Sequence, residues 1–274
     1  MYVNIDGNVY YFERYGEGFP LLLLHGFTGS TKTWVPYMER LSKNFQVIAV
    51  DLPGHGNTKV KTPFSMKTVC EHIFKVMNKL GYETFHLLGY SMGGRTALSF
   101  TMYFPDCVEK LILESASPGL ERDEERKERR EKDEALCQMI EEKGLEAFVH
   151  YWENIPLFQS QKRLPVEEQQ RIRQGRLNQS AEGLIQSLRY MGTGTQPSWW
   201  NDLATCKQQT LLIAGALDEK YIKINKKMEK LMPRASLSIV EQTGHAPHVE
   251  DVEKFGKIVE DFLLGRVEMK KEDT

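Results

Sequence analysis

Short apolar runs alternate with helical patterns along most of the chain, and this alternation restricts the fold more than any other feature of the sequence. The runs at 20–26 and 45–56 are nearly continuous in hydrophobic residues and end in glycine, as is typical of strands covered on both faces. Strands that alternate with helices imply right-handed crossovers and a mostly parallel sheet. The sequence therefore predicts an α/β fold in which helices cover both faces of a doubly wound, mostly parallel sheet.

The same alternation places the remaining elements. Two short N-terminal strands, joined at Asp6-Gly7-Asn8, indicate an antiparallel hairpin over residues 2–15. Further strands are expected at 84–90, 108–116, 210–218 and 235–242. The expected helices cover residues 30–43, 66–81, 93–104, 224–232 and 251–265.

The segment from about Pro118 to Trp200 breaks this alternation. It has no convincing strand pattern, is rich in Glu, Arg, Lys and Gln, and is expected to form three or four helices. Ligands of such sheets bind beyond the carboxyl ends of the strands, and helices inserted between two strands would lie over those ends. We therefore predict an α/β core of residues 1–117 and 201–274 with a helical cap of residues 118–200.

One cap residue stands out within the charged run "ERDEERKERREKDE". Most of this run indicates a solvated helix face with pairs of opposite charge four residues apart. Helical spacing, however, puts Arg129 and Asp133 on the same face as Leu136 and Ile140. Since the two apolar residues must face the core, Arg129 is expected to point inward with them.

The bulk composition restricts the expected partners and cellular location of the protein. A formal net charge of -2 gives no reason to expect a nucleic-acid or membrane partner. The four cysteines are far apart and form no C-x-x-C pair, which favours reduced thiols in a cytosolic protein. The N-terminus has no basic start followed by a long apolar run, and the longest aliphatic run, Leu21–Leu24, is too short to cross a bilayer. We expect a cytoplasmic location.

A serine lies at a tight turn between a predicted strand and a predicted helix. The motif G-x-S-x-G at Gly89–Gly93 would occur by chance in roughly one chain in ten of this length, so alone it is weak. Its context is more specific, because an apolar strand precedes it and a helix follows it, as in a nucleophile elbow. Ser91 is therefore the candidate nucleophile or base.

A serine hydroxyl needs an imidazole to take its proton and a carboxylate to orient that imidazole. In this fold the acid follows a later strand and the histidine lies near the end of the chain, which points to Asp218 and His245. Glu114 also ends a strand and is the reserve acid. His248 is a rival that we expect to be an ordinary loop residue, and His55 is a loop residue that could touch substrate.

The oxyanion hole is expected to use two backbone N–H groups. One belongs to Met92, directly after the serine, and the other to the "HGFTGS" loop, most plausibly Phe27. No His or Cys cluster has the spacing of metal ligands, and no glycine-rich phosphate loop is present. We therefore expect no metal and no cofactor.

The chain resembles the α/β-hydrolase superfamily over nearly its whole length, through "HGFTGS", "DLPGHG", "GYSMGG", "LDEK" and "GHAPH" in that order. Within it, the chain is similar to the menaquinone-pathway family that forms 2-succinyl-6-hydroxy-2,4-cyclohexadiene-1-carboxylate. That similarity lies in "GYSMGGR", "SASPGL", "RREKD", "YWENIPLF", "GRLNQS" and "MGTGTQPSWW", several of them in the predicted cap.

The resemblance implies a lyase rather than a hydrolase. Pyruvate would be expelled from a succinyl-cyclohexene carrying an enolpyruvyl ether, with Ser91, relayed to His245, acting as base. The substrate is a tricarboxylate, and the resemblance matches Arg95, Arg129 and Arg176 to the residues that bind its carboxylates.

Other site residues follow from the same resemblance. Tyr90 and Trp152 match positions near the substrate, where an aromatic side chain is more often wall than chemistry. The run around Arg129 is dense in arginine, so Arg126 or Arg130 could take its place.

Two other classes of function remain open from the sequence. The same triad suits a general carboxylesterase or carbon–carbon bond hydrolase, for which the cap arginines would carry no weight. A non-catalytic binding module on the same fold is also possible, because fold alone does not determine function.

Overall fold

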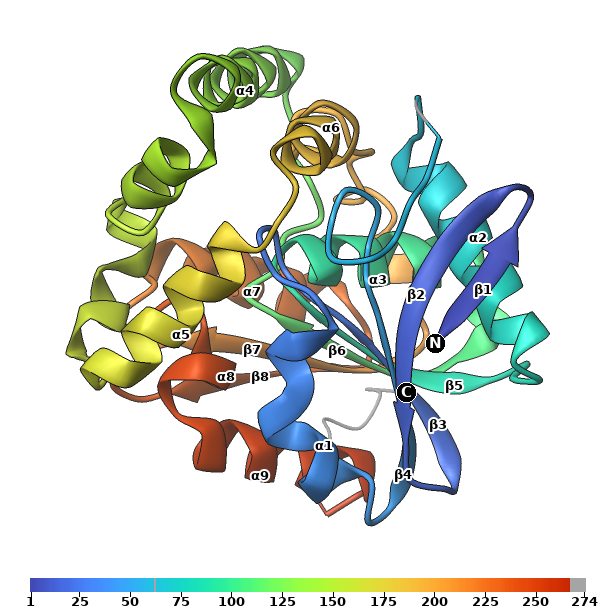
Figure 1. Cartoon of the computed structure of the whole chain (residues 1–274). Helices are drawn as coiled ribbons and strands as arrows, with labels where there is room; N and C mark the ends of the chain where they lie inside the picture. The colour runs from blue at the N-terminus through green and yellow to red at the C-terminus, as the bar shows by residue number, and fades with distance from the viewer. Residues whose placement is uncertain (62, 267–274) are drawn as a thin grey trace.

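The computed structural model describes residues 1–61 and 63–266. Its sheet has the strand order β1-β2-β4-β3-β5-β6-β7-β8 (Figure 1). Strands β1 and β2 pair antiparallel, as do β2 and β4, and all other neighbours are parallel. The predicted fold class is confirmed. The strands are β1 (Tyr2–Ile5), β2 (Asn8–Tyr15), β3 (Phe19–Leu24), β4 (Phe45–Val50), β5 (Phe85–Tyr90), β6 (Val108–Glu114), β7 (Gln209–Gly215) and β8 (Ala235–Val240).

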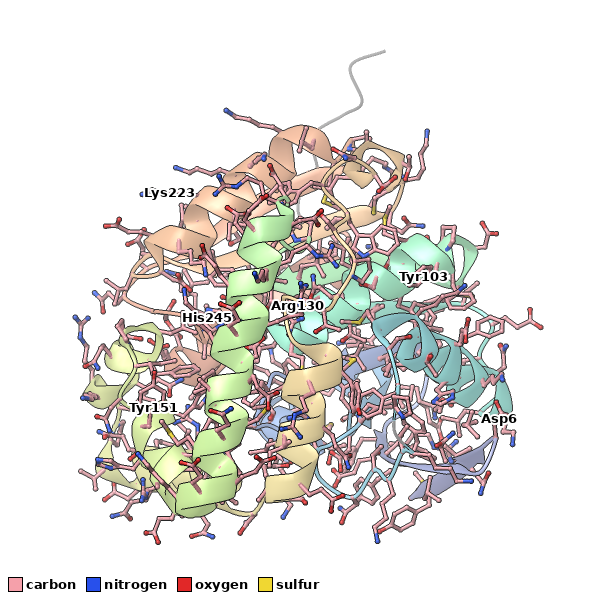
Figure 2. The ribbon with its side chains drawn as sticks, turned by 90° about the horizontal axis from the view of Figure 1, so that it is seen from above. Asp6, Tyr103, Arg130, Tyr151, Lys223 and His245 are labelled. Atoms are coloured by element: carbon pink, nitrogen blue, oxygen red, sulfur yellow. The ribbon has the colours of Figure 1, made fainter. Side chains whose placement is uncertain are left out.

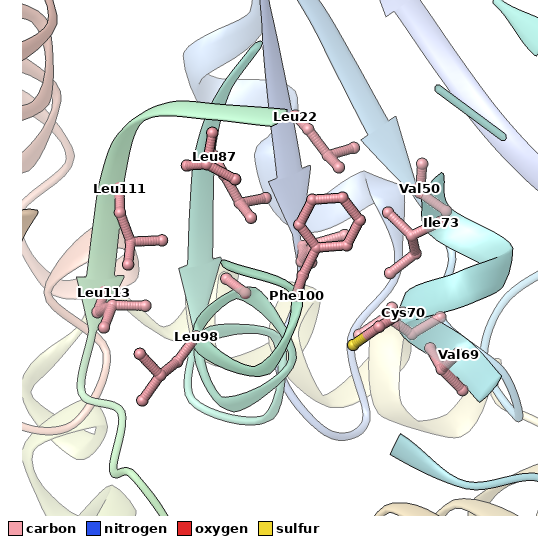
Figure 3. Packing of buried hydrophobic residues seen from close by; sticks show 14 of the residues in the cluster. Leu22, Val50, Val69, Cys70, Ile73, Leu87, Leu98, Phe100, Leu111 and Leu113 are labelled. Carbon is pink, nitrogen blue, oxygen red and sulfur yellow. The ribbon is translucent and has the colours of Figure 1, made fainter. Parts of the chain in front are cut away.

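The leucine run of β3 explains why these strands are nearly continuous in hydrophobic residues. Leu22 and Leu24 belong to the core cluster on one face of the sheet, whereas Leu21 and Leu23 belong to the cluster on the other face. Side chains alternate across a strand, so a strand covered on both faces must be apolar at every position. Figure 3 shows the first of these clusters, with Leu22 beside residues of α2 and α3.

Helices cover both faces of the sheet. The first cluster is completed by α2 (Met66–Lys79), α3 (Met92–Tyr103) and α7 (Glu219–Leu231). The second is completed by α1 (Val35–Leu41) and α9 (Val252–Leu263), and the short α8 (Pro247–Glu250) precedes α9. Short 3-10 turns lie at η1 (Thr31–Trp34), η2 (Pro105–Cys107) and η4 (Leu203–Thr205).

One predicted helix is divided in the structure. The segment expected as a single helix over 30–43 forms the 3-10 turn η1 followed by α1. Pro36 is the reason, because it has no N–H to donate to the carbonyl four residues earlier, and it is tolerated only in the first turn of a helix. The α-helix therefore begins at Val35.

The segment between β6 and β7 is helical throughout its main elements, as expected. It comprises α4 (Asp123–Trp152), η3 (Pro156–Arg163), α5 (Val166–Leu177) and α6 (Ala181–Met191). Helix α4 is interrupted at Gly144, whose φ is 79°. Helices α4 and α6 lie side by side on one side of the sheet (Figure 1) and share a hydrophobic cluster of their own. The division into a core and a cap of residues 118–200 stays a prediction, to which this arrangement gives support.

Within residues 1–61 and 63–266, no helix combines the length and hydrophobicity that crossing a bilayer requires.

Helix α3 presses against the end of β3 through a glycine, and this contact can be tested. A Cβ on Gly93 would overlap the backbone carbonyls of Leu24 and His25, which cannot rotate away. We expect Gly93→Ala to lower the free energy of unfolding by about 2 kcal/mol, as overpacking typically does. Gly175→Ala on α5, where a Cβ meets no atom within 4 Å, should instead be neutral or stabilising by up to about 1 kcal/mol. Urea unfolding of both variants measures the difference, and equal stability would contradict it.

Candidate active site

Ser91 occupies a strained backbone conformation between β5 and α3. Its φ of 51° and ψ of -106° are unusual for a residue with a side chain. Backbone hydrogen bonds hold it on both sides, because Ser91 N donates to Glu114 O (2.8 Å) and Arg95 N donates to Ser91 O (2.9 Å). The tight return also needs Gly89, where a Cβ would overlap the backbone of Gly93. The predicted nucleophile elbow is present in the geometry.

The structure brings Ser91, His245 and Asp218 into one hydrogen-bonded chain. His245 Nδ1 lies 2.7 Å from Asp218 Oδ2, and His245 Nε2 lies 3.1 Å from Ser91 Oγ. A carboxylate only accepts, so Nδ1–H donates to Asp218 and Nε2 is left to accept the serine proton. The remaining Asp218 oxygen accepts from Tyr221 N (3.2 Å) as the N-cap of α7. The residues are thus arranged for proton transfer from the serine hydroxyl.

The two backbone N–H groups expected in the oxyanion hole have no acceptor among residues 1–61 and 63–266. Met92 is the first residue of α3, so its N–H has no partner within the helix. Among the hydrogen bonds of the described residues, neither Met92 N nor Phe27 N appears as a donor. Both groups are available to a negative oxygen, and their assignment to an oxyanion hole stays a prediction.

The two rival residues of the triad are paired with each other. His248 Nδ1–H donates to Glu114 Oε1 (2.8 Å), and His248 N donates to the same oxygen (2.9 Å). Both side chains are almost fully buried. The expectation that His248 is an ordinary loop residue is wrong, since it lies in α8 and ties this helix to the end of β6. His245 Nδ1 bonds to Asp218 and not to Glu114, so the structure favours Asp218 as the acid.

Arg95 lies on α3 with its side chain beneath the helices that follow β6. Only 8% of the residue is exposed. Its Nη1 donates to Met191 O (2.9 Å) and to the side-chain oxygen of Gln196. Burial, assisted by the charge of Arg129, lowers the pKa of the Arg95 guanidinium to about 10. The two guanidinium groups are therefore close enough to repel each other.

Arg129 lies on the face of α4 that the helical spacing predicted. Ile140 is buried in the cluster shared with α6, and Leu136 packs against it. Arg129 Nε donates to Asp133 Oδ1 (2.8 Å), and the other carboxylate oxygen of Asp133 is buried without a partner among the described residues. Burial raises the pKa of Asp133, with the charge of Arg129 opposing it.

The two neighbouring arginines on α4 are placed differently. Arg130 Nη1 donates to Gly194 O (2.9 Å), which ties α4 to the segment after α6. Figure 2 looks down on the molecule from above, where α4 crosses in front of the sheet and carries Arg130. For Arg126 the structure shows no side-chain hydrogen bond or ion pair among the described residues. Arg129 remains the better candidate, because it pairs with the buried Asp133 on the inward face of α4.

Arg176 is buried on α5, on the side of the site where Tyr90 lies. Its guanidinium carbon lies 4.8 Å from the centroid of the Phe158 ring, and Nη2 donates to Gln161 Oε1 (3.2 Å). Burial lowers the pKa of Arg176, while the neighbouring Tyr90 opposes this shift. All three predicted arginines therefore point toward the interior to some degree, although 35% of the Arg129 side chain is exposed.

Aromatic side chains surround the catalytic imidazole. The ring centroids of Tyr90, Tyr221 and Phe158 lie 5.6, 4.6 and 6.0 Å from that of His245. The ring of Trp152 lies 5.4 Å from Phe27, and its Nε1 is buried with no acceptor among the described residues. These rings exclude water around the triad, and Trp152 offers a donor to a ligand.

A cavity of about 780 Å³ opens next to this cluster. Its walls include Phe27, Tyr90, Phe158, Arg176 and His248. Of the described residues that line it, none belongs to the triad or is Arg95 or Arg129. The cavity therefore reaches the site from the Arg176 side.

Several residues of the site were not singled out in the sequence. Tyr221, Phe158 and Gln161 touch the imidazole or Arg176, and Gln196 holds Arg95. Phe158 and Gln196 fall in the motifs "YWENIPLF" and "MGTGTQ", so the resemblance carried a signal for them. Tyr221 follows Asp218 by three residues, and only the helix that Asp218 begins turns its ring toward His245.

Residues 1–61 and 63–266 contain no group of three or more His, Cys, Asp or Glu side chains that could hold a metal ion. The expectation that the protein needs no metal or cofactor stays a prediction.

Comparison with known proteins agrees with the fold. A family model described as alpha/beta hydrolase fold matches residues 20–252, most of the chain. The protein belongs to the α/β hydrolase fold family.

Within that family, the names of similar proteins indicate which enzymes the chain resembles. A Bacillus subtilis (strain 168) protein named putative 2-succinyl-6-hydroxy-2,4-cyclohexadiene-1-carboxylate synthase is 43% identical over 246 residues, 89% of each chain. The solved structure of MenH from S. aureus superposes with a TM-score of 0.89 at 38% identity, covering 93% of this chain and 98% of that one. A thermophilic esterase from Thermogutta terrifontis, solved with malate bound, is 26% identical with a TM-score of 0.85 over 96% of each chain.

The triad can be tested without any knowledge of the substrate. Asp218→Asn keeps an oxygen that can cap α7, but it removes the charge that orients His245 and stabilises its protonated form. We expect labelling of Ser91 by a fluorophosphonate probe to slow by about 100-fold or more, since related triads lose about 10⁴ in kcat. Asp106→Asn, at an exposed carboxylate in η2, serves as the control. Equal labelling rates for both variants would contradict the assignment.

Proposed function

We propose that this protein eliminates pyruvate from 2-succinyl-5-enolpyruvyl-6-hydroxy-3-cyclohexene-1-carboxylate to give 2-succinyl-6-hydroxy-2,4-cyclohexadiene-1-carboxylate in menaquinone biosynthesis. It is thus a carbon–oxygen lyase that uses a hydrolase-type triad. The observation that carries the proposal is the hydrogen-bonded chain of Ser91, His245 and Asp218 beside buried arginines. The 43% identity to a relative named for this product supports it.

The triad geometry suits a proton abstraction. His245 Nε2 takes the proton of Ser91, whose oxygen then removes a substrate proton activated by a conjugated carbonyl. The resulting enolate oxygen is stabilised by the N–H groups of Phe27 and Met92, which also suit the oxyanion of an acyl-transfer reaction. Collapse of the enolate expels the enolpyruvyl oxygen, to which the His245 imidazolium gives its proton, and tautomerisation of the released enol gives pyruvate. Asp218 stabilises the imidazolium formed in the first step.

The arginines supply the charge that a tricarboxylate requires. The charge of Arg129 acts on the buried Arg95, whereas Arg176 lines the cavity. A guanidinium binds a carboxylate through two parallel hydrogen bonds, and burial strengthens them. Substrate would share or replace the acceptors now bound to Arg95 and Arg129. Tyr90 and Trp152 complete the walls, and the indole N–H of Trp152 is available as a donor.

The same proposal includes the cellular location and the partners of the enzyme. We assign it a cytoplasmic location, which the four free cysteines support because reduced thiols persist there. Its partner is the small tricarboxylate substrate, with no cofactor or metal and with no nucleic acid or membrane.

Pyruvate release is the direct test of the function. With the enolpyruvyl substrate, the wild-type protein should release pyruvate, measured by coupling to lactate dehydrogenase and NADH. Ser91→Ala and His245→Ala should each lower kcat by about 10³-fold or more, because each removes a step of the proton transfer. His150→Ala, at an exposed histidine on α4, should have no effect. Release no faster than the uncatalysed rate would exclude the proposal.

The arginines should affect binding more than turnover. Replacing Arg95, Arg129 or Arg176 by Lys keeps the charge but removes the two-pronged hydrogen bond. We expect KM to rise about 10-fold or more with a smaller change in kcat, since about 1.4 kcal/mol of binding is lost. Arg163→Lys, at an exposed position in η3, is the matched control. An unchanged KM in all three variants would argue against a polyanionic substrate.

Ester hydrolysis is the second candidate, favoured by the similarity to the Thermogutta terrifontis esterase. A general esterase should turn over neutral nitrophenyl esters with burst kinetics and should be indifferent to Arg95→Lys. A binding module on this fold would instead retain ligand after Ser91→Ala with no activity to lose. The buried arginines favour the lyase over both, because a neutral ester would leave their charge uncompensated.

A further inference from the structure

Two loops meet at the carboxyl edge of the sheet, and each contributes a buried histidine. The loop after β3 carries His25, and the loop after β4 carries His55. The two residues are 0% and 1% exposed, and their ring centroids lie 5.1 Å apart. Neither ring takes part in the triad, so the role of each histidine lies in the groups that it holds.

His25 bonds to the opposite loop and to its own. Leu52 N donates to His25 Nε2 (2.9 Å), so this nitrogen must be unprotonated. The proton of the neutral ring is then on Nδ1, which donates to Gly26 O (2.8 Å). The tautomer follows from the partners, because a backbone N–H can only donate and a carbonyl can only accept.

His55 makes the reciprocal arrangement. Thr28 N donates to His55 Nε2 (3.2 Å), and Nδ1–H donates to Pro53 O (3.1 Å). Each loop therefore supplies an imidazole that accepts from the backbone of the other loop. Asp51 ties the same two loops again, through Thr31 N (2.6 Å) and Asn57 N (2.8 Å).

These bonds act on the peptide group that carries the expected oxyanion donor. The carbonyl of Gly26 and the N–H of Phe27 belong to one planar peptide unit, in which they point in opposite directions. When His25 holds Gly26 O, it therefore also orients Phe27 N–H. His55 holds the next peptide through Thr28 N, at a residue whose φ of 67° is unfavourable without support.

Both imidazoles are kept neutral, which is the protonation state that these hydrogen bonds require. Burial lowers the pKa of His25, against the nearby charge of Asp51. Burial also lowers the pKa of His55 to about 3, with the neighbouring His25 adding to the shift. Neutral rings retain an acceptor nitrogen, whereas an imidazolium would present two donors to the backbone.

We propose that His25 and His55 are positioning residues of the oxyanion hole, which clamp the Gly26–Phe27–Thr28 backbone so that Phe27 N–H points at the developing negative oxygen. They touch no reacting atom and act through the main chain. Because the charge develops only in the transition state, losing the clamp should lower kcat and leave KM nearly unchanged. The inference rests on the proposed function for its kinetic readout.

Substitution of a histidine by asparagine or by glutamine distinguishes the roles of its two ring nitrogens. The amide of Asn reaches the place of Nδ1, and that of Gln reaches the place of Nε2. His25→Asn can still donate to Gly26 O, whereas His25→Gln cannot. His55→Gln can still accept from Thr28 N, whereas His55→Asn cannot. The clamp therefore requires opposite outcomes at the two positions.

We expect kcat for pyruvate release to fall by about 10- to 100-fold in His25→Gln and His55→Asn, as for a displaced oxyanion donor. His25→Asn and His55→Gln should stay within about 5-fold of wild type, and KM should change by less than about 3-fold in all four. His86→Asn is the control, because His86 is a buried histidine near the start of β5, packed between Phe19 and Phe45. It should lower the melting temperature without lowering kcat.

Amide hydrogen exchange gives a second readout that needs no substrate. Exchange of Thr28 N–H should accelerate in His55→Asn but not in His55→Gln, and exchange of Leu52 N–H should accelerate in His25→Asn but not in His25→Gln. Equal kcat in the two variants at each position, or equal amide protection, would overturn the proposal. If wild-type protein releases no pyruvate, the proposed function fails instead, and the exchange rates still decide whether the clamp exists.

Discussion

The left-handed turn at Ser91 is the constraint on which the rest of the site depends. A non-glycine residue in this region costs on the order of 1–3 kcal/mol, and it persists only where surrounding structure holds it. Here β6 accepts its N–H, α3 bonds to its carbonyl, and glycines let α3 approach the end of β3. The turn directs the hydroxyl away from the sheet and directs the first N–H of α3 to the same place. His245 and the oxyanion loop are then positioned relative to that point.

Under the proposed function, the arginines give the predicted helical cap a part in the chemistry. A guanidinium on α3 alone would face solvent, where its attraction to a carboxylate is weak. The last residue of α6 and the segment after it provide the acceptors of Arg95, while α4 carries Arg129, whose charge acts on Arg95, and α5 carries the buried Arg176. Buried cations without full compensation attract anions strongly, so the same fold that supports ester hydrolysis in relatives can select a polyanion here.

Much of the fold and triad could be predicted from the sequence, since both follow local rules. The strands, most helices, and the placing of Asp218 and His245 after β7 and β8 needed only periodicity and chain order. The division of the helix at Pro36 was not predicted. The effect of one missing N–H on where a helix begins depends on the conformation of the turn that precedes it. The pairing of His248 with Glu114 was missed because it joins positions 134 residues apart.

The sequence by itself determined which residues we propose to carry the chemistry, because the elbow, the triad order and the cap motifs are short and local. Only the tertiary structure decided how those residues are held. The tautomers of His25, His55 and His245, the cover over Arg95 and the orientation of Phe27 N–H each depend on a partner from a distant segment. A linear pattern carries no distance between such segments, and hydrogen-bond geometry is decided by distances of a few tenths of an ångström.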